Sequence, residues 1–233
     1  ITLSGIETAN LTGGGATNAF TVSSWTGTAN LAGLLGDDSY TVNANAGAGI
    51  VNVTDTGGTN TITVNGTAGA DAFTLAATSG TTSAVTLTGG TVVNSTDAEI
   101  GTLTVDGLAS DDSFTVSALT RTATLAGGAG TGDSITAVND VGAIGLSDTS
   151  LTRSALGTIT LSGIETANLT GGGATNTFTV SGWTGAGTIT GGGGSDVIEA
   201  VKDVATISLS DTALSSSDGM NLTLLGIGTA NLT

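Results

Sequence analysis

Between its glycines, the chain alternates apolar and polar residues over short runs. The runs NTITVNG (60–66), GTLTVDG (101–107) and FTVSG (178–182) place a branched or aromatic apolar residue at every second position. This period of two is typical of β-strands that bury one face. No stretch carries the 3.6-residue period of an amphipathic helix, and the density of Gly and β-branched Thr also disfavours helices. We therefore predict an all-β fold.

A ten-residue motif links these runs. It consists of an aliphatic residue, any residue, Gly, a turn of small residues, Asp or Asn, any residue and a large apolar residue, as in LTGGGATNAF (11–20) and ITGGGGSDVI (189–198). The first glycines of its copies are Gly13, Gly33, Gly66, Gly107, Gly127, Gly171 and Gly191. Three of the intervals are equal, those from Gly13 to Gly33, from Gly107 to Gly127 and from Gly171 to Gly191, and two others are near twice as long. We predict that roughly 20–22 residues form one coil of a parallel β-solenoid, or β-helix.

Longer repeats favour an array over one large core. Residues 1–27 and 159–185 differ at only two positions, and residues 137–151 recur as 200–214. Such repetition indicates an array, a propeller or a solenoid. A sandwich array also fits short strands with frequent turns, but near-identical coils would stack Thr on Thr and Asn on Asn. We predict a single β-solenoid array over residues 1–233, and expect it to be part of a longer chain or filament.

The charge of the chain limits its partners. Its net charge is −16, with three basic residues, no His and no Cys. Nucleic acid requires a basic footprint that this sequence lacks, and anionic membrane surfaces are excluded on the same ground. No run of about 18 apolar residues predicts a membrane span. The absence of Cys excludes disulfides and suits an extracellular protein without redox chemistry.

One stretch raises the question of calcium. Residues 191–199, GGGGSDVIE, fit the calcium-binding nonapeptide G-G-x-G-x-D-x-U-x. True calcium rolls repeat this motif in tandem, whereas no two copies here directly follow one another. The alternative, which we favour, is that the Asp or Asn caps the turn by accepting bonds from backbone N–H groups. No cofactor is then required. If calcium binds, the candidate ligands are Asp112, Asp133, Asp196, Asp38 and Asp71.

The same spacing predicts how these residues stack. In coils that repeat at the interval from Gly13 to Gly33, Asn18 should lie beside Asp38, and Asn176 beside Asp196. An amide beside a carboxylate avoids like-charge contact without any ion. Asp112 beside Asp133 would be the one stacked pair of acids.

The remaining motifs favour no enzyme. Asp37–Asp38 and Asp111–Asp112 look like carboxylate pairs, but neighbours along a strand point to opposite faces. Thr-x-Thr recurs along the chain, for example at 61–63, 102–104 and 158–160, as an ice-binding face would require, yet its spacing is too irregular to predict one continuous face. Trp25 and Trp183 occupy the same repeat position. We interpret them as core or cap residues rather than as exposed residues that stack on carbohydrate.

The segments LSGIETANLTGGGATNTFTVSGWTG (161–185), VNGTAGADAFTL (64–75) and IGTLTVDGL (100–108) resemble the β-strand-repeat regions of very large bacterial cell-surface and secreted proteins. These are adhesins, biofilm-matrix proteins and filament proteins built from degenerate relatives of the RTX repeat. The resemblance covers essentially the whole chain. It implies a structural, extracellular role at the bacterial cell surface, as a stalk, filament or adhesin segment.

Unpaired coils at both ends are templates for further strand pairing, so we expect self-association end to end. Carbohydrate and other cell-surface ligands are further partners that the resemblance implies, whereas nucleic acid and membrane insertion are not expected. Two alternatives stay open, a calcium-binding RTX-like module and an ice-binding solenoid.

Overall fold

The computed structural model describes residues 5–138 and 142–233, which fold into β-strands arranged in two sheets. As the absence of a helical period predicts, these residues contain no α-helix; they include one 3-10 turn, η1 (Asp97–Glu99). Sheet A contains, in spatial order, β1 (Thr8–Thr12), β3 (Thr28–Ala32), β5 (Ile50–Thr54), β9 (Val92–Thr96), β8 (Thr82–Leu87), β7 (Ala72–Ser79), β11 (Ser113–Ser117), β13 (Ser134–Val138), β17 (Thr166–Thr170), β19 (Ala186–Thr190), β23 (Asn221–Leu225), β22 (Ala213–Ser216) and β21 (Ile207–Ser210). Sheet B contains β2 (Ala19–Ser23), β4 (Ser39–Asn43), β6 (Asn60–Asn65), β10 (Ile100–Asp106), β12 (Ala123–Ala126), β16 (Ile159–Ser162), β15 (Ser150–Arg153), β14 (Ala143–Ser147), β18 (Thr177–Gly182), β20 (Asp196–Ala200) and β24 (Ile227–Leu232).

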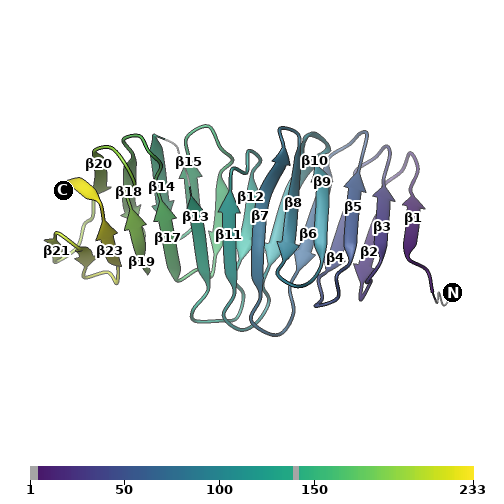
Figure 1. Cartoon of the computed structure of the whole chain (residues 1–233), viewed down its shortest axis with the longest axis horizontal. Coiled ribbons are helices and arrows are strands. Elements are labelled where there is room, and N and C mark those ends of the chain that lie inside the picture. Colours follow the sequence, from purple (N-terminus) through teal and green to yellow (C-terminus); the bar gives the residue numbers. More distant parts are fainter. Residues whose placement is uncertain (1–4, 139–141) are drawn as a thin grey trace.

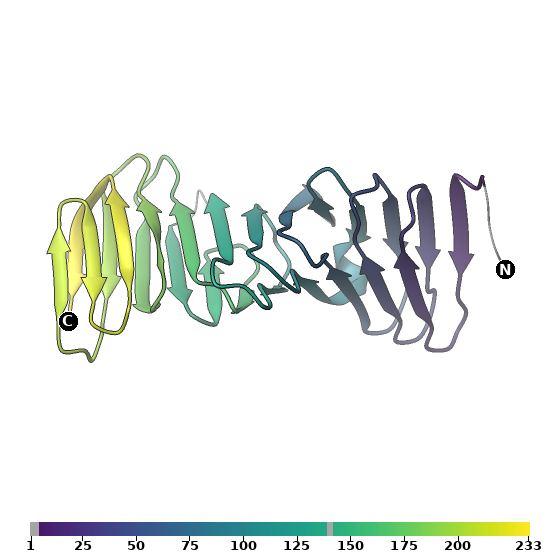
Figure 2. The ribbon, with the colours of Figure 1, turned by 90° about the horizontal axis from the view of Figure 1, so that it is seen from below.

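Along most of the chain, successive strands alternate between the two sheets, and each pairs in parallel with a strand further along the sequence. The strands β1 (TANLT) and β3 (TANLA) pair so that identical residues lie side by side, with Asn10 beside Asn30. Partners in the regular regions are offset by one predicted coil, since Thr8 pairs with Thr28 and Thr28 with Ile50. Figures 1 and 2 show the strands following one another along the long axis, from the N-terminal end to the C-terminal end.

Three antiparallel meanders interrupt this alternation. The strands β7–β8–β9 and β21–β22–β23 fold back on themselves within sheet A, and β14–β15–β16 do so within sheet B. Each meander lengthens the interval between parallel partners; Ala72 of β7, for example, lies beside Ser113 of β11. The predicted parallel pairing is therefore correct for the regular strands and for one edge of β7, β9, β14, β16 and β23. It is wrong for β8, β15, β21 and β22, whose pairs are all antiparallel, because local alternation specifies a strand but not its partner.

The core lies between the two sheets, where the alternating apolar residues of both meet. In β4, β6 and β10, Val42, Ile62 and Leu103 are buried, and the Thr residues between them face outward. Burial of a side chain of this size contributes roughly 1.5–3 kcal/mol relative to an exposed one. We call one strand of each sheet, together with the turn that joins them, a rung. Because each rung supplies only a few such residues, the core depends on many thin layers that stack along the axis.

Both sheets end in edge strands that pair on one side only. In Figure 1, β1 and β2 lie near the N-terminal end, and β21 and β24 are the outermost strands at the C-terminal end. No helix among the residues placed in the structure is long and apolar enough to cross a membrane.

Candidate functional site: glycine–aspartate turns and a threonine face

The predicted Gly and Asp positions meet in turns between the two sheets that carry the ten-residue motif. In GGGGSDVIE, Gly191 lies directly beneath the carboxylate of Asp196, the first residue of β20. A Cβ atom on Gly191 would overlap Oδ2 of Asp196, and Gly33 and Gly107 stand in the same relation to Asp38 and Asp112. Glycine is required here because the acidic side chain folds back over the backbone. The stretch is therefore a turn that enters a strand.

The Asp and Asn side chains also join one rung to the next. The backbone N–H of Asn18 donates to Oδ1 of Asp38 over 2.6 Å, and that of Asn176 donates to Oδ1 of Asp196 over 2.7 Å. Both predicted stacks are thus confirmed. The oxygens satisfy backbone donors that would otherwise be buried and unpaired.

The turns form two separate rows, because three strands, β4 to β6, separate Asp38 from Asp71, and an odd number of strands moves the motif to the opposite crossing between the sheets. Asn18, Asp38, Asn176 and Asp196 lie where the chain passes from sheet A to sheet B, whereas Asp71, Asp112 and Asp133 lie where it returns. Asp38 and Asp71 therefore do not share a row.

The second row is more acidic than predicted. The N–H of Asp71 donates to Oδ1 of Asp112, and the N–H of Asp112 donates to Oδ1 of Asp133, each over 2.7 Å. The N–H of Asp133 in turn donates to Glu165 Oε2 over 2.9 Å. The expectation of a single stacked pair is wrong, because the meander brings Asp71 next to Asp112 across 41 residues.

This row perturbs Asp112. The pKa of its carboxyl is raised to about 6, chiefly by burial; the hydrogen bond from the Asp71 backbone lowers the pKa, and the charges of Asp71, Asp133 and Asp106 raise it. A carboxyl in this range is partly protonated in mildly acidic solution.

All five predicted calcium ligands are buried, as the turn-cap interpretation requires. In Asp71 both oxygens accept bonds from Thr67. The Oδ2 atoms of four others are buried without a hydrogen-bond partner: Asp38, Asp112, Asp133 and Asp196. Carboxylate oxygens are the ligands that calcium takes. Within the described ranges, however, no three acidic, His or Cys side chains group closely enough to hold a metal ion.

Two members of the rows were missed from the sequence, Asn60 and Glu165. Asn60 accepts the N–H of Asp38 over 2.8 Å and donates to the carbonyl oxygen of Glu99. A signal was present, since VTDTGGTNTI (53–62) follows the motif with Asp55 in place of its first Gly. Asp55 accepts the hydroxyl of Tyr40 over 2.6 Å, and burial together with this carboxylate raises the Tyr40 pKa.

The apparent acid pairs and the two Trp residues were the other candidates from the sequence. In both apparent acid pairs one residue is buried and one exposed, so the pair does not converge; Asp37 instead accepts the N–H of Thr59. Trp183 is fully buried and donates its indole N–H to the carbonyl oxygen of Ala186 over 3.3 Å, and Trp25 is half-buried. The core interpretation is thus confirmed for Trp183.

Sheet B carries a continuous column of outward Thr residues. It crosses six neighbouring strands and consists of Thr21, Thr41, Thr63, Thr104, Thr124 and Thr160. In the next column, Thr61 lies beside Thr102. The inference that irregular spacing precludes a continuous face is wrong for this sheet, because the β7–β9 meander lengthens the chain between Thr63 and Thr104 without adding a strand to sheet B.

Comparison with known proteins gives no relative: no family model, no curated protein and no solved structure matches the chain.

Proposed function

We propose that the chain is a structural, extracellular protein of the bacterial cell surface, a stalk, filament or adhesin segment that associates end to end. In this proposal the two sheets are opposite walls of one parallel β-solenoid. Each coil contains as many residues as separate neighbouring partners along a sheet, such as Thr8 and Thr28 or Thr28 and Ile50. The regular alternation of strands between the sheets supports it, as does the stacking of like residues along each sheet.

The observation that carries the proposal is that both sheets run along the whole described chain and end in edge strands that pair on one side only. Hydrogen bonds between rungs point along the long axis, so a pull on the ends loads all the bonds of one rung together. The strands β1, β2, β21 and β24 each leave one edge of backbone donors and acceptors open. Such edges pair readily with further strands.

Sedimentation velocity and negative-stain electron microscopy over a range of concentrations test this proposal. We expect rods that lengthen in whole multiples of one molecule, with a width that stays constant. A monomer that persists at every concentration would contradict end-to-end association. Clusters of molecules joined side by side would contradict it as well.

A calcium-binding module is the first alternative, and the four unpartnered Oδ2 atoms favour it. A thermal melt by circular dichroism, with millimolar calcium and then with a chelator, separates the two. A ligand present at about a hundred times its Kd stabilises the folded state by about 2.7 kcal/mol. The scaffold proposal predicts no shift of the melting temperature, whereas a large shift would identify the turns as ion sites.

An ice-binding module is the second alternative, and the Thr column of sheet B favours it. Thermal hysteresis measured on the chain tests this reading. Ice binding predicts that Thr63→Lys abolishes hysteresis, because the charge interrupts the column. Thr115→Lys, on the outer face of sheet A, should leave it unchanged.

A further inference from the structure

The two ends of the chain repeat parts of its interior. Residues 200–233 align without a gap with residues 137–170, so β21 to β24 repeat β14 to β17. The segment TANLT occurs three times, in β1, in β17 and at residues 229–233. The interior copy therefore shows what normally packs against a segment of this sequence.

In the interior, two strands cover this segment. β18 pairs with β14, with Phe178 beside Ile144, and β19 pairs with β17, with Thr188 beside Asn168. The apolar side chains beneath them are nearly inaccessible: Leu146, Leu161, Ile164 and Ala167.

A carboxylate anchors the same interior joint. Asp148 accepts the backbone N–H of Thr184 over 2.7 Å and its hydroxyl over 2.9 Å. The backbone N–H of Asp148 donates to the carbonyl oxygen of Gly182 over 3.0 Å. A negative charge is thus matched to donors on the covering loop.

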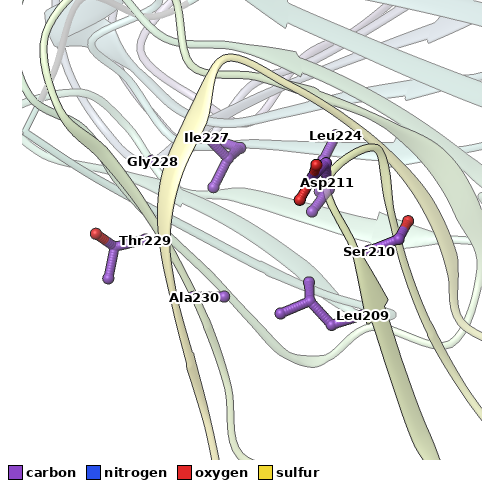
Figure 3. A pocket seen from close by; sticks show the side chains of 8 residues that line it. All are labelled: Leu209, Ser210, Asp211, Leu224, Ile227, Gly228, Thr229 and Ala230. Atoms are coloured by element: carbon purple, nitrogen blue, oxygen red, sulfur yellow. The ribbon is translucent and has the colours of Figure 1, made fainter.

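At the C-terminal end the corresponding place is open. β21 and β24 are edge strands, and the residues between them line a cavity of about 240 Å³. Figure 3 shows Leu209, Leu224, Ile227 and Ala230 around this cavity with Asp211 at one side. Leu209 is 49% exposed, whereas its interior counterpart Leu146 is 3% exposed.

The N-terminal end carries a copy of the strand that would fill this cavity. Residues 19–27 (AFTVSSWTG) match 177–185 (TFTVSGWTG) at all but two positions. Phe20, Val22 and Trp25 therefore correspond to Phe178, Val180 and Trp183, which are fully buried in the interior joint. Thr26 corresponds to Thr184, the partner of Asp148, and so matches Asp211.

We propose that β21 and β24 of one molecule bind β2 and β3 of a second copy, and that β24 takes the place of the second copy's β1. This contact between two molecules, which we call the joint, rests on the proposed end-to-end association and specifies which residues pair across it. By the interior template, Ile207 lies beside Phe20, and Asn231 beside Asn30.

The exchange is favourable because β1 and β24 present the same TANLT residues to β3, so that little is lost on that side. β1 pairs on one edge only. The pairing of β21 with β2, the filled cavity and the Asp211–Thr26 contact are all gained. These gains favour β24 of the other molecule over β1 as the partner of β3.

Disulfide trapping tests the joint, since the chain has no Cys. The double variant Asn30→Cys/Asn231→Cys places the thiols at opposite ends of one molecule, so a bond between them joins two molecules. Oxidation should yield dimers and longer ladders on a non-reducing gel. Asn52→Cys/Asn231→Cys is the control, because Asn52 lies one strand further inside than Asn30 and should not react.

Three single variants measure the association itself by sedimentation. Leu209→Asp should weaken it about tenfold or more, because that side chain is no longer buried in the joint. Leu11→Asp weakens the competing β1 and should strengthen association. Val201→Asp is the control, since Val201 and its interior counterpart Val138 are both exposed and lie outside the joint.

If rods form but the paired cysteines do not react, this joint is wrong and the proposed function stands. If neither rods nor cross-links form, both are wrong. Equal association by the Leu209→Asp and Val201→Asp variants would also overturn the joint, even in the presence of rods.

Discussion

Residues 1–27 and 159–185 have almost the same sequence, but they lie at an end and in the interior of the molecule. Both contain the TANLT strand and the Phe-Thr-Val strand that follows it. Leu11 is 47% exposed and its interior counterpart Leu169 is 1% exposed; Ile6 and Ile164 differ in the same way. The local sequence thus specifies strands and turns, whereas the neighbouring rung supplies burial. Stability should therefore reside mainly in the contacts between rungs.

The largest expected effect comes from the two Trp residues. Trp183→Ala should lower the free energy of unfolding by about 3–5 kcal/mol, as removal of a fully buried aromatic side chain does. Trp25→Ala should cost about half as much, because Trp25 is only half-buried. Urea unfolding followed by circular dichroism measures both. Equal losses would show that burial at this position does not depend on the neighbouring rung.

The second effect contrasts the row of turns that contains Asp112 with the row that contains Asn176 and Asp196. A carboxyl whose folded-state pKa is raised binds more protons in the folded state than in the unfolded state, so Asp112 stabilises the fold as the pH falls from about 6 toward 4. At neutral pH this contribution is lost. Asp112→Asn should therefore raise stability at pH 7 by about 1–3 kcal/mol, and it should flatten the pH dependence over this interval.

Urea unfolding at pH 4, 5.5 and 7 checks this prediction. The matched control is Asp196→Asn, whose neighbour in the row, Asn176, is already neutral; the gain there should be smaller. A destabilised Asp112→Asn variant at pH 7 would mean that the charge of Asp112 is compensated in the folded protein, for example by a bound cation.

The smallest effect concerns the outer face of sheet A. Asn52 donates to Asn30 over 2.8 Å and accepts from Asn94 over 2.9 Å, so it is the centre of a row of side-chain amides. Asn168, in the interior copy, lies between Thr136 and Thr188. Asn52→Ala should cost about 1 kcal/mol more than Asn168→Ala, the value of one or two hydrogen bonds. Thermal melts compare the two, and a larger loss at Asn168 would refute the role of the amide row.

Sequence reasoning predicted the parts of the fold that depend on local pattern. The alternation in NTITVNG predicts β6, and the interval from Gly13 to Gly33 predicts that Asn18 stacks on Asp38. It failed at the meanders, where the interval from Gly66 to Gly107 resembled a skipped coil. The alternation in β8 is as regular as in β6, so it cannot show that β8 returns within its own sheet. The acidic run from Asp71 to Asp133 was incompletely predicted for the same reason.

The repeat that relates residues 137–170 to residues 200–233 has a geometric consequence. Its first meander, β14–β16, lies in sheet B, and its second, β21–β23, lies in sheet A, because the chain crosses between the sheets five times from β16 to β21. An odd number of crossings makes the repeat act as a half-turn screw, which carries each copy to the opposite side of the molecule. A surface feature encoded once in this repeat is therefore displayed on one side of the molecule in the first copy and on the opposite side in the second.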